Sequence, residues 1–165
     1  MENYENYIEF ITLILDSAQE YADKNSTCAK VKVGSCIIPV EGMFENAVHG
    51  CNHGISNCKE FGCRRKKLYG NASKEHRLPS DCDALHSEID AICKAAKKGV
   101  NLQGATIFVT RYPCEACARA IGESGIKKIF YGRKESISEY TQHILNAYMV
   151  DCVKVENWER EDDNE

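Results

Sequence analysis

The chain has 165 residues, 43% of them apolar, and a formal net charge of -4. This is the size of one domain with one core, and the acidic balance argues against a protein whose main task is to coat a nucleic-acid backbone. No apolar run approaches the roughly 18 to 20 residues that cross a bilayer. The amino terminus lacks the pattern of an export signal, so we expect the ten cysteines to belong to a reduced, cytoplasmic protein rather than to a disulfide framework.

The first part of the chain predicts one helix and two strands. Apolar residues recur at three- and four-residue spacing over 7–22, which is typical of an amphipathic helix. Two strand-like runs follow at 31–38 and 43–50. Because Pro39 and Gly42 lie between them as turn signals, we expect an antiparallel hairpin.

The stretch 52–82 differs from its surroundings. It is rich in Gly, Asn, Ser and charged residues, and it shows neither a helical nor a strand period. Loops of this length inside a compact domain are uncommon unless they are functional or held in place. Since the stretch contains three cysteines and two histidines, we expect these side chains to hold it.

Periodic elements alternate again after the insertion. The pattern predicts helices over 85–98, 114–125 and 137–148, and strands over 105–110, 126–131 and 151–155. Helices separated by single strands favour a three-layer α/β/α fold, with a central mixed sheet of about five strands covered on both faces. We expect one domain over 1–158 that includes the insertion 52–82, followed by an acidic, disordered tail over 159–165.

Two short segments carry candidate chemistry, HSE at 86–88 and PCEAC at 113–117. Cys114 and Cys117 are one helical turn apart, so both sulfurs face the same side, and His86 begins another helix. One imidazole and two thiolates leave a fourth position open on tetrahedral zinc, which is the mark of a catalytic site. Zinc lowers the pKa of water in that position to about 7, and Glu88 is near enough to move its protons.

These segments resemble the H-x-E and P-C-x-x-C signature of the zinc-dependent cytidine deaminase superfamily. The segments NCKEFGC (57–63), KEHR (74–77) and SGIKKIFYG (124–132) are similar to its deoxycytidylate branch. The resemblance implies a cytidine-deaminase-like fold, a homo-oligomer, and zinc-dependent hydrolytic deamination of a cytosine nucleotide, with dCMP giving dUMP and ammonia as the preferred assignment. By position, His86, Cys114 and Cys117 would bind the catalytic zinc and Glu88 would be the proton shuttle.

The same resemblance implies further site residues. Asn52 matches an asparagine that binds a sugar hydroxyl, and Tyr131 matches an aromatic residue near the pyrimidine pocket. Their structural alternatives are a turn residue for Asn52 and a core residue for Tyr131. A second, structural zinc would fasten the insertion to the first helix. Its implied ligands are Cys28, Cys58, His76 and Cys82, with Cys63 as a substitute, and the alternative is a set of reduced thiols.

Several features leave the substrate open. The chain reads NHGISN from Asn52, where the deoxycytidylate branch usually continues with Gly, and it has Asp90 where that branch usually has Asn. Residues 58–82 hold seven basic side chains against three acidic ones, which would attract a nucleotide phosphate or simply be solvated. The rival functions are deamination of another nucleobase, a nucleoside or a nucleic-acid base, and a non-catalytic, zinc-stabilised nucleotide-binding module.

Overall fold

The computed structural model describes residues 2–54, 57–70, 81–133, 138–156 and 158. Its centre is a five-stranded sheet in the order β2-β1-β5-β6-β7. The first strand pairs antiparallel with β2 and β5, and the last three strands run parallel, so the predicted hairpin and the mixed sheet are both confirmed. The strands are β1 (Gly34–Ile38), β2 (Val48–Cys51), β5 (Thr106–Arg111), β6 (Lys128–Arg133) and β7 (Asp151–Lys154).

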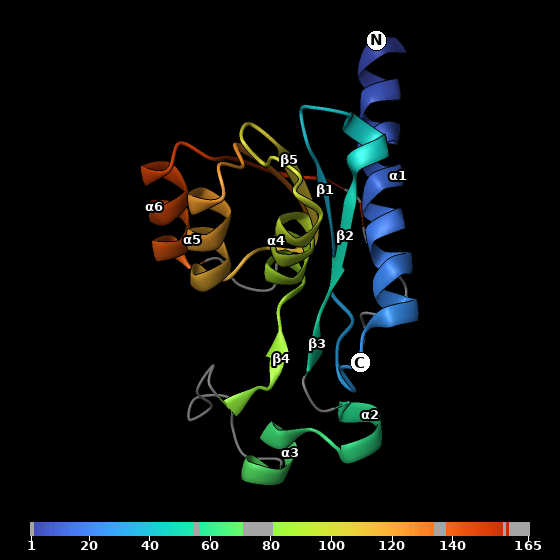
Figure 1. The fold of residues 1–165 in the computed structure, drawn as a ribbon, viewed down its shortest axis with the longest axis vertical. Helices are drawn as coiled ribbons and strands as arrows, with labels where there is room; N and C mark the ends of the chain where they lie inside the picture. Colours follow the sequence, from blue (N-terminus) through green and yellow to red (C-terminus); the bar gives the residue numbers. More distant parts are fainter. Residues whose placement is uncertain (1, 55–56, 71–80, 134–137, 157, 159–165) are drawn as a thin grey trace.

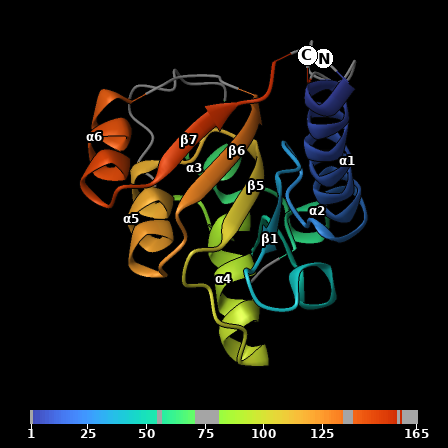
Figure 2. The same cartoon turned by 90° about the horizontal axis from the view of Figure 1, so that it is seen from above.

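Helices cover both faces of this sheet, which confirms the predicted three-layer architecture (Figures 1 and 2). The long first helix packs alone on one face, and three shorter helices pack on the other. They are α1 (Glu2–Asn25), α4 (Ser87–Lys98), α5 (Glu115–Glu123) and α6 (Glu139–Ala147). The end of α4 is explained by Gly99, which follows the helix with a φ of 69° in the left-handed region.

Alternation along β5 divides the core into two clusters. Ile107 and Val109 face α4, α5 and α6, whereas Phe108 faces α1, where it stacks on Phe130 with ring centroids 5.3 Å apart. Because side chains alternate with a period of two, shifting this strand by one residue would bury each side chain on the wrong face. The position of the carboxyl end of β5, which leads into the PCEAC segment, is therefore fixed by packing.

The second predicted strand is wrong over its first residues. Residues Met43–Asn46 form a 3₁₀ turn, η1, and β2 begins only at Val48. Gly42 precedes the turn with a φ of 73°, and the side chains of Met43 and Phe44 are exposed. Apolar residues that do not face the sheet gain nothing from extended structure, so the local turn geometry prevails there.

The insertion forms short elements at one end of the molecule, beyond the end of the sheet (Figure 1). They are β3 (His53–Gly54), α2 (Cys58–Phe61), α3 (Arg64–Tyr69) and β4 (Ala84–Leu85), and β3 pairs antiparallel with β4. Each is too short for a period to be visible in sequence. The expectation of one domain over 1–158 stays a prediction, and the tail 159–165 lies outside the described residues.

None of the helices in the described ranges is long and apolar enough to cross a membrane.

Candidate active site

Two helix N-termini bring the three predicted catalytic metal ligands together. His86 and Cys114 are the N-cap residues of α4 and α5, and Cys117 lies in the first turn of α5. The Nδ1 atom of His86 is 3.5 Å from the Sγ atom of Cys114 and 3.4 Å from that of Cys117. All three ligand atoms lie within 4.8 Å of one another. This spacing is that of a metal centre whose ligands converge on one point.

The local sequence explains why these side chains meet. The strand β5 ends at Arg111, and Pro113 is followed by Cys114, from which α5 starts. The two-residue strand β4 delivers His86 to the start of α4 in the same way. Both helix starts present unpaired backbone N–H groups and the positive end of the helix dipole, and both features favour thiolates there.

The electrostatics of the three side chains fit a divalent cation. Hydrogen bonds with Cys117 and His86 lower the pKa of Cys114 to about 3 against the opposing effect of burial. The same hydrogen bond with Cys114, together with burial, raises the pKa of Cys117, and Cys114 also raises the pKa of His86. Ionisation is therefore favoured at Cys114 and opposed at Cys117. Because zinc prefers sulfur and imidazole ligands and stabilises two adjacent thiolates, the donor set fits zinc.

Glu88 lies beside the metal ligands in a buried position. Only 4% of the residue is exposed, and burial raises the pKa of its carboxyl group. One carboxylate oxygen accepts a hydrogen bond from the Ser87 hydroxyl at 3.0 Å, and the carboxyl group is close enough to Cys117 to raise the pKa of that thiol. A carboxyl group with a raised pKa can both accept and donate a proton near neutral pH.

The start of α4 is fixed directly against the sheet. The Ser35 hydroxyl donates to the Ser87 carbonyl oxygen at 2.7 Å. A Cβ atom built on Gly50 would lie 2.2 Å from the same oxygen and 2.6 Å from the backbone nitrogen of Ala91. Only a glycine allows β2 to approach the helix so closely. The position of Glu88 is therefore set by the Ser35 hydrogen bond and by the close backbone packing at Gly50.

Asn52 closes the turn after β2. Its side-chain oxygen accepts hydrogen bonds from the Val33 amide and the Ser26 hydroxyl, both at 2.8 Å, and its Nδ2 atom donates to the Val31 carbonyl at 2.7 Å. Among the groups that the structure describes, none accepts the second Nδ2 hydrogen. These bonds are those of the turn residue considered above, and the binding of a sugar hydroxyl stays a prediction.

Tyr131 lies in the core on the α5 and α6 side of the sheet. It is 6% exposed, its ring meets that of Tyr112 edge to face with centroids 4.9 Å apart, and burial raises its pKa. Core packing accounts for these contacts. Its place near a pyrimidine pocket stays a prediction.

The cysteines predicted for the second zinc gather around Cys58. Burial raises the pKa of Cys58, and the neighbouring thiols and Asp83 raise it further. The neighbours are Cys28, Cys63 and Cys82. His76 lies outside the described residues. Over the described ranges, only His86, Cys114 and Cys117 have three ligand atoms within 4.8 Å of one another, and the second zinc stays a prediction.

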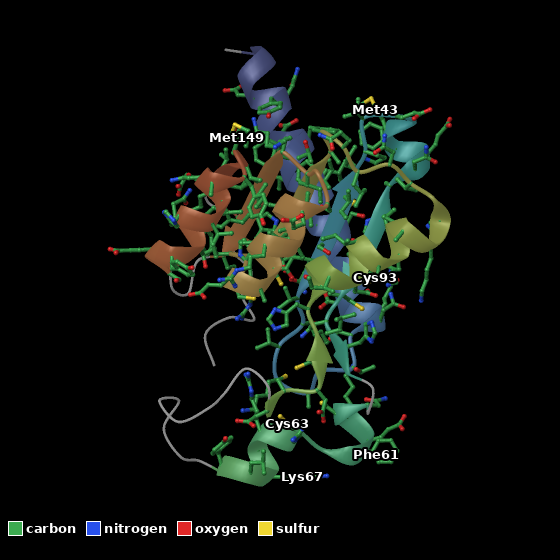
Figure 3. All side chains as sticks on the ribbon, turned by 60° about the vertical axis from the view of Figure 1, so that its left-hand side comes forward. Met43, Phe61, Cys63, Lys67, Cys93 and Met149 are labelled. Carbon is green, nitrogen blue, oxygen red and sulfur yellow. The ribbon has the colours of Figure 1, made fainter. Side chains whose placement is uncertain are left out.

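Basic residues of the insertion act electrostatically on His86. Helix α3 begins with four consecutive cations, Arg64 to Lys67, and Figure 3 shows Cys63 and Lys67 on this part of the insertion. Arg64 forms an ion pair with Asp83 at 3.1 Å. Arg65 is near enough to His86 to act against the rise in its pKa. Positive charge therefore lies within electrostatic reach of the metal ligands.

Sequence reasoning missed an ionic cluster around the buried Asp90 on α4. The Oδ1 atom of Asp90 is 3.1 Å from the Nε2 atom of His53, and its Oδ2 atom accepts from Lys94 at 2.6 Å. His53 and Asp90 are two of the positions at which the chain departs from the deoxycytidylate pattern. That they depart together was the only signal in the sequence, and it becomes meaningful once the structure places them in contact.

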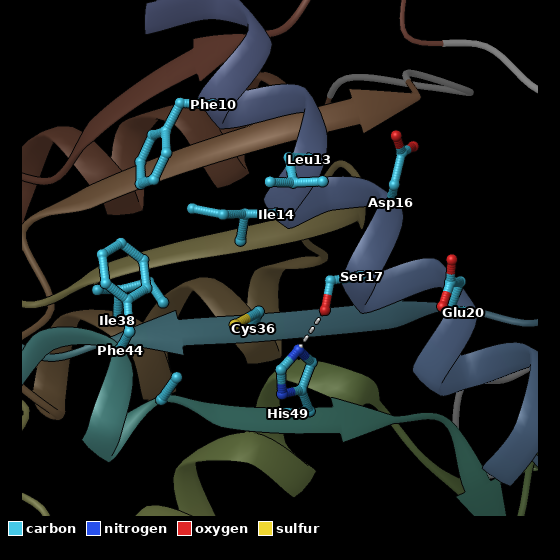
Figure 4. A pocket seen from close by; sticks show the side chains of 11 residues that line it. Phe10, Leu13, Ile14, Asp16, Ser17, Glu20, Cys36, Ile38, Phe44 and His49 are labelled. Atoms are coloured by element: carbon cyan, nitrogen blue, oxygen red, sulfur yellow. Dashed lines mark hydrogen bonds between the residues drawn. The ribbon is translucent and has the colours of Figure 1, made fainter.

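An apolar hollow lies elsewhere, between α1 and the β1–β2 hairpin (Figure 4). Phe10, Leu13 and Phe44 line it, and Ser17 and His49 form a hydrogen bond of 2.9 Å at its wall. None of the predicted site residues lines this hollow. The candidate active site is therefore the metal centre at the helix N-termini.

A His/Cys/Cys centre with a buried glutamate, built on two helix N-termini of a three-layer α/β/α domain, defines a zinc-dependent deaminase fold. Residues 8–133 match the family described as the cytidine and deoxycytidylate deaminase zinc-binding region. The chain belongs to this family.

Several relatives cover most of the chain. It is 30% identical over 132 residues to ComE operon protein 2 of Bacillus subtilis, an alignment that covers 79% of this chain and 64% of that protein. It is 30% identical over 135 residues to the deoxycytidylate deaminase of Enterobacteria phage T4, covering 66% of this chain and 70% of the phage protein. The chain thus spans somewhat less than two thirds of the first relative's length.

The fold is also found in solved structures. The dCMP deaminase of cyanophage S-TIM5 in its apo form superposes with a TM-score of 0.61 at 23% identity, covering 88% of this chain and 97% of the phage chain. At this identity the likeness supports the fold alone.

Proposed function

We propose that the protein is a zinc-dependent hydrolase that converts dCMP to dUMP and ammonia. The observation that carries the proposal is the buried carboxyl group of Glu88 beside the converged ligands His86, Cys114 and Cys117. Related proteins from phage T4 and Homo sapiens are named deoxycytidylate deaminase. The cyanophage enzyme of the same fold was solved in complex with dCMP and dUMP.

The proposed mechanism assigns the proton transfers to Glu88. When bound by His86, Cys114 and Cys117, zinc supplies the Lewis acidity that makes water nucleophilic at neutral pH. Glu88 accepts a proton from the attacking water and donates it to the ring nitrogen N3 as the C–O bond forms at C4. It then passes the second proton to the amine, so that the C4–N bond breaks and ammonia leaves. The Ser87 hydroxyl orients the carboxylate during these transfers.

Two features support a nucleotide as the substrate. The cations of α3 lie close enough to the metal ligands for Arg65 to influence His86, and a phosphate would be attracted to this charge. Asn52 retains one amide hydrogen for a sugar hydroxyl after its three bonds within the described residues. Tyr131 is buried against Tyr112, and it would line the pyrimidine side of the site as part of this pair of rings.

We further propose a second, structural zinc at the base of the insertion. Its ligands are Cys28, Cys58, His76 and Cys82, with Cys63 as a substitute. The observation in favour is that the other three thiols all lie close enough to Cys58 to raise its pKa. Such a site would contribute folding free energy that the short elements α2 and α3, which bury no residue fully, do not supply by packing.

The setting of the protein is part of the same proposal. All ten cysteines are free thiols in the structure, which supports a reducing compartment such as the cytoplasm. We infer a homo-oligomer from the family resemblance, and light scattering of the purified protein would give its mass. A mass equal to one chain would contradict that inference.

The experiment that tests the function is ammonia release from a panel of compounds. The purified protein is offered dCMP, dCTP, deoxycytidine, cytosine and single-stranded DNA, and Glu88→Gln serves as the matched control for contaminating activity. We expect release from dCMP by the natural protein alone. Release from another compound would identify that compound as the substrate in place of dCMP. No release from any compound would favour the nucleotide-binding module.

A further inference from the structure

Asp90 is a buried carboxylate whose two oxygens are both used. It lies on α4 two residues after Glu88 and is 4% exposed. Its Oδ2 atom accepts hydrogen bonds from the Cys51 amide at 3.0 Å and from Lys94 at 2.6 Å, and its Oδ1 atom is 3.1 Å from His53. Burial opposes ionisation, yet these three bonds together lower the pKa of Asp90, so it carries a charge at neutral pH.

These bonds join three parts of the fold. Lys94 also donates to the hydroxyl of Tyr21 on α1 at 3.1 Å, so the ionic cluster links α1 to α4. Cys51 ends β2 and His53 begins β3, so these two residues flank Asn52 at the turn between the strands. Asp90 therefore holds this turn from both sides of Asn52 and connects it to the helix that carries Glu88.

Asp90 provides side-chain hydrogen bonds between α4 and the two residues that flank Asn52. Within the described residues, the side chain of Asn52 bonds to groups in the segment 26–33, and the pairing of His53 with Leu85 joins the turn to the strand that precedes α4. Glu88 is fixed independently, because Ser35 and Gly50 hold the start of α4 against the sheet. Loss of the Asp90 carboxylate would therefore remove the side-chain links between this turn and α4, while the contacts at Ser35 and Gly50 would still hold Glu88 in place.

We propose that Asp90 is a positioning residue that sets the distance between the substrate-binding turn and the proton shuttle. It acts through the Cys51 amide and the His53 ring, and it does not touch the substrate. The inference rests on the proposed function, since it takes the turn at Asn52 to contact the nucleotide. A turn that moves relative to Glu88 binds the substrate less well, whereas the chemistry of bound substrate continues.

The distinction between KM and kcat separates this role from general stabilisation. If Asp90 only stabilised the fold, its removal would reduce the fraction of active, zinc-loaded protein and so lower the apparent kcat at unchanged KM. If it positions the turn, KM rises while kcat and zinc content stay close to those of the natural protein. An asparagine keeps one oxygen that can accept from the Cys51 amide, so it should restore KM.

The test measures steady-state dCMP deamination and zinc content in the full chain and in Asp90→Ala and Asp90→Asn. We expect Asp90→Ala to raise KM by about tenfold or more, because small displacements of binding groups cost this much. Asp90→Asn should keep KM within about threefold of the natural value. Unchanged KM in Asp90→Ala, or equal losses in the two variants, would overturn the proposal.

His53→Ala provides a second variant in case Asp90→Ala does not fold. Its side chain is 40% exposed, so its removal leaves the core intact while it takes away one of the two links to the turn. We expect KM to rise by about threefold, and an unchanged KM would contradict the positioning role. If the natural protein releases no ammonia from dCMP, the proposed function fails; turnover with equal KM in all variants removes only the role of Asp90.

Discussion

The two cysteine clusters use the same side chains on different scaffolds. Cys114 caps and Cys117 lies on a nine-residue helix that packs into the core through Ala118 and Ile121, both fully buried. Cys58 begins a helix of four residues and Cys63 caps a helix of six, and neither helix has a buried side chain. The first cluster has ligand atoms within 4.8 Å of one another, and the second does not reach this spacing among the described residues.

This difference shows what each metal would have to do. Where burial already fixes the helices, a metal adds little to folding and its free position is available for chemistry. Where burial is absent, the metal itself would supply the folding free energy. Changes at the two clusters should therefore affect different properties, activity at the first and local stability at the second.

Replacement of a catalytic ligand should have the largest effect. Cys117→Ser exchanges a thiolate for a hydroxyl group that binds zinc poorly, so we expect loss of one zinc ion and of detectable deamination. The fold should survive because the α5 core is untouched, and circular dichroism with metal analysis would show this. Full activity in Cys117→Ser would rule out the assignment of the first cluster.

Glu88→Gln should retain zinc and still lose most of the activity. The amide has nearly the same shape but cannot carry the proton, so we expect kcat to fall by about 10³-fold. Zinc content by mass spectrometry distinguishes this variant from Cys117→Ser. Near-normal turnover would contradict the role of Glu88 as the proton shuttle.

Gly50→Ala would show how strictly the frame behind the first cluster is set. The new methyl group would overlap the Ser87 carbonyl, and we expect a loss of about 1–3 kcal/mol in the free energy of unfolding. Displacement of α4 should also lower kcat by about tenfold, because Glu88 moves with it. A variant with the natural melting temperature and kcat would mean that β2 and α4 can separate freely.

Cys58→Ser should affect the second cluster alone. We expect the zinc content to fall by about one ion per chain. The kcat should fall by no more than about threefold, because the helices that hold His86, Glu88, Cys114 and Cys117 pack outside the insertion. Cys93→Ser, an exposed cysteine outside both clusters, is the matched control and should change neither value. One zinc per chain in the natural protein would remove the second site.

Sequence patterns predicted the elements whose side chains follow a regular helical or strand period. The helix period over 7–22 and the spacing of Cys114 and Cys117 depend on neighbouring residues alone, so they could be recognised in the sequence. The contact between His53 and Asp90 joins residues 37 positions apart and follows no period. The turn at Met43–Asn46 was missed because its apolar side chains resemble a strand yet remain exposed.

The short β3–β4 pair joins the two ends of the insertion. Its register joins His53 to Leu85 and Gly54 to Ala84, so the insertion leaves and re-enters the domain at a single point. An insertion whose two ends are paired in this way can gain or lose residues at a modest entropic cost, because the entropy of loop closure grows only slowly with loop length. Under the proposed function, exchange of the segment between these strands is therefore expected to change nucleotide binding while His86 keeps its place at the start of α4.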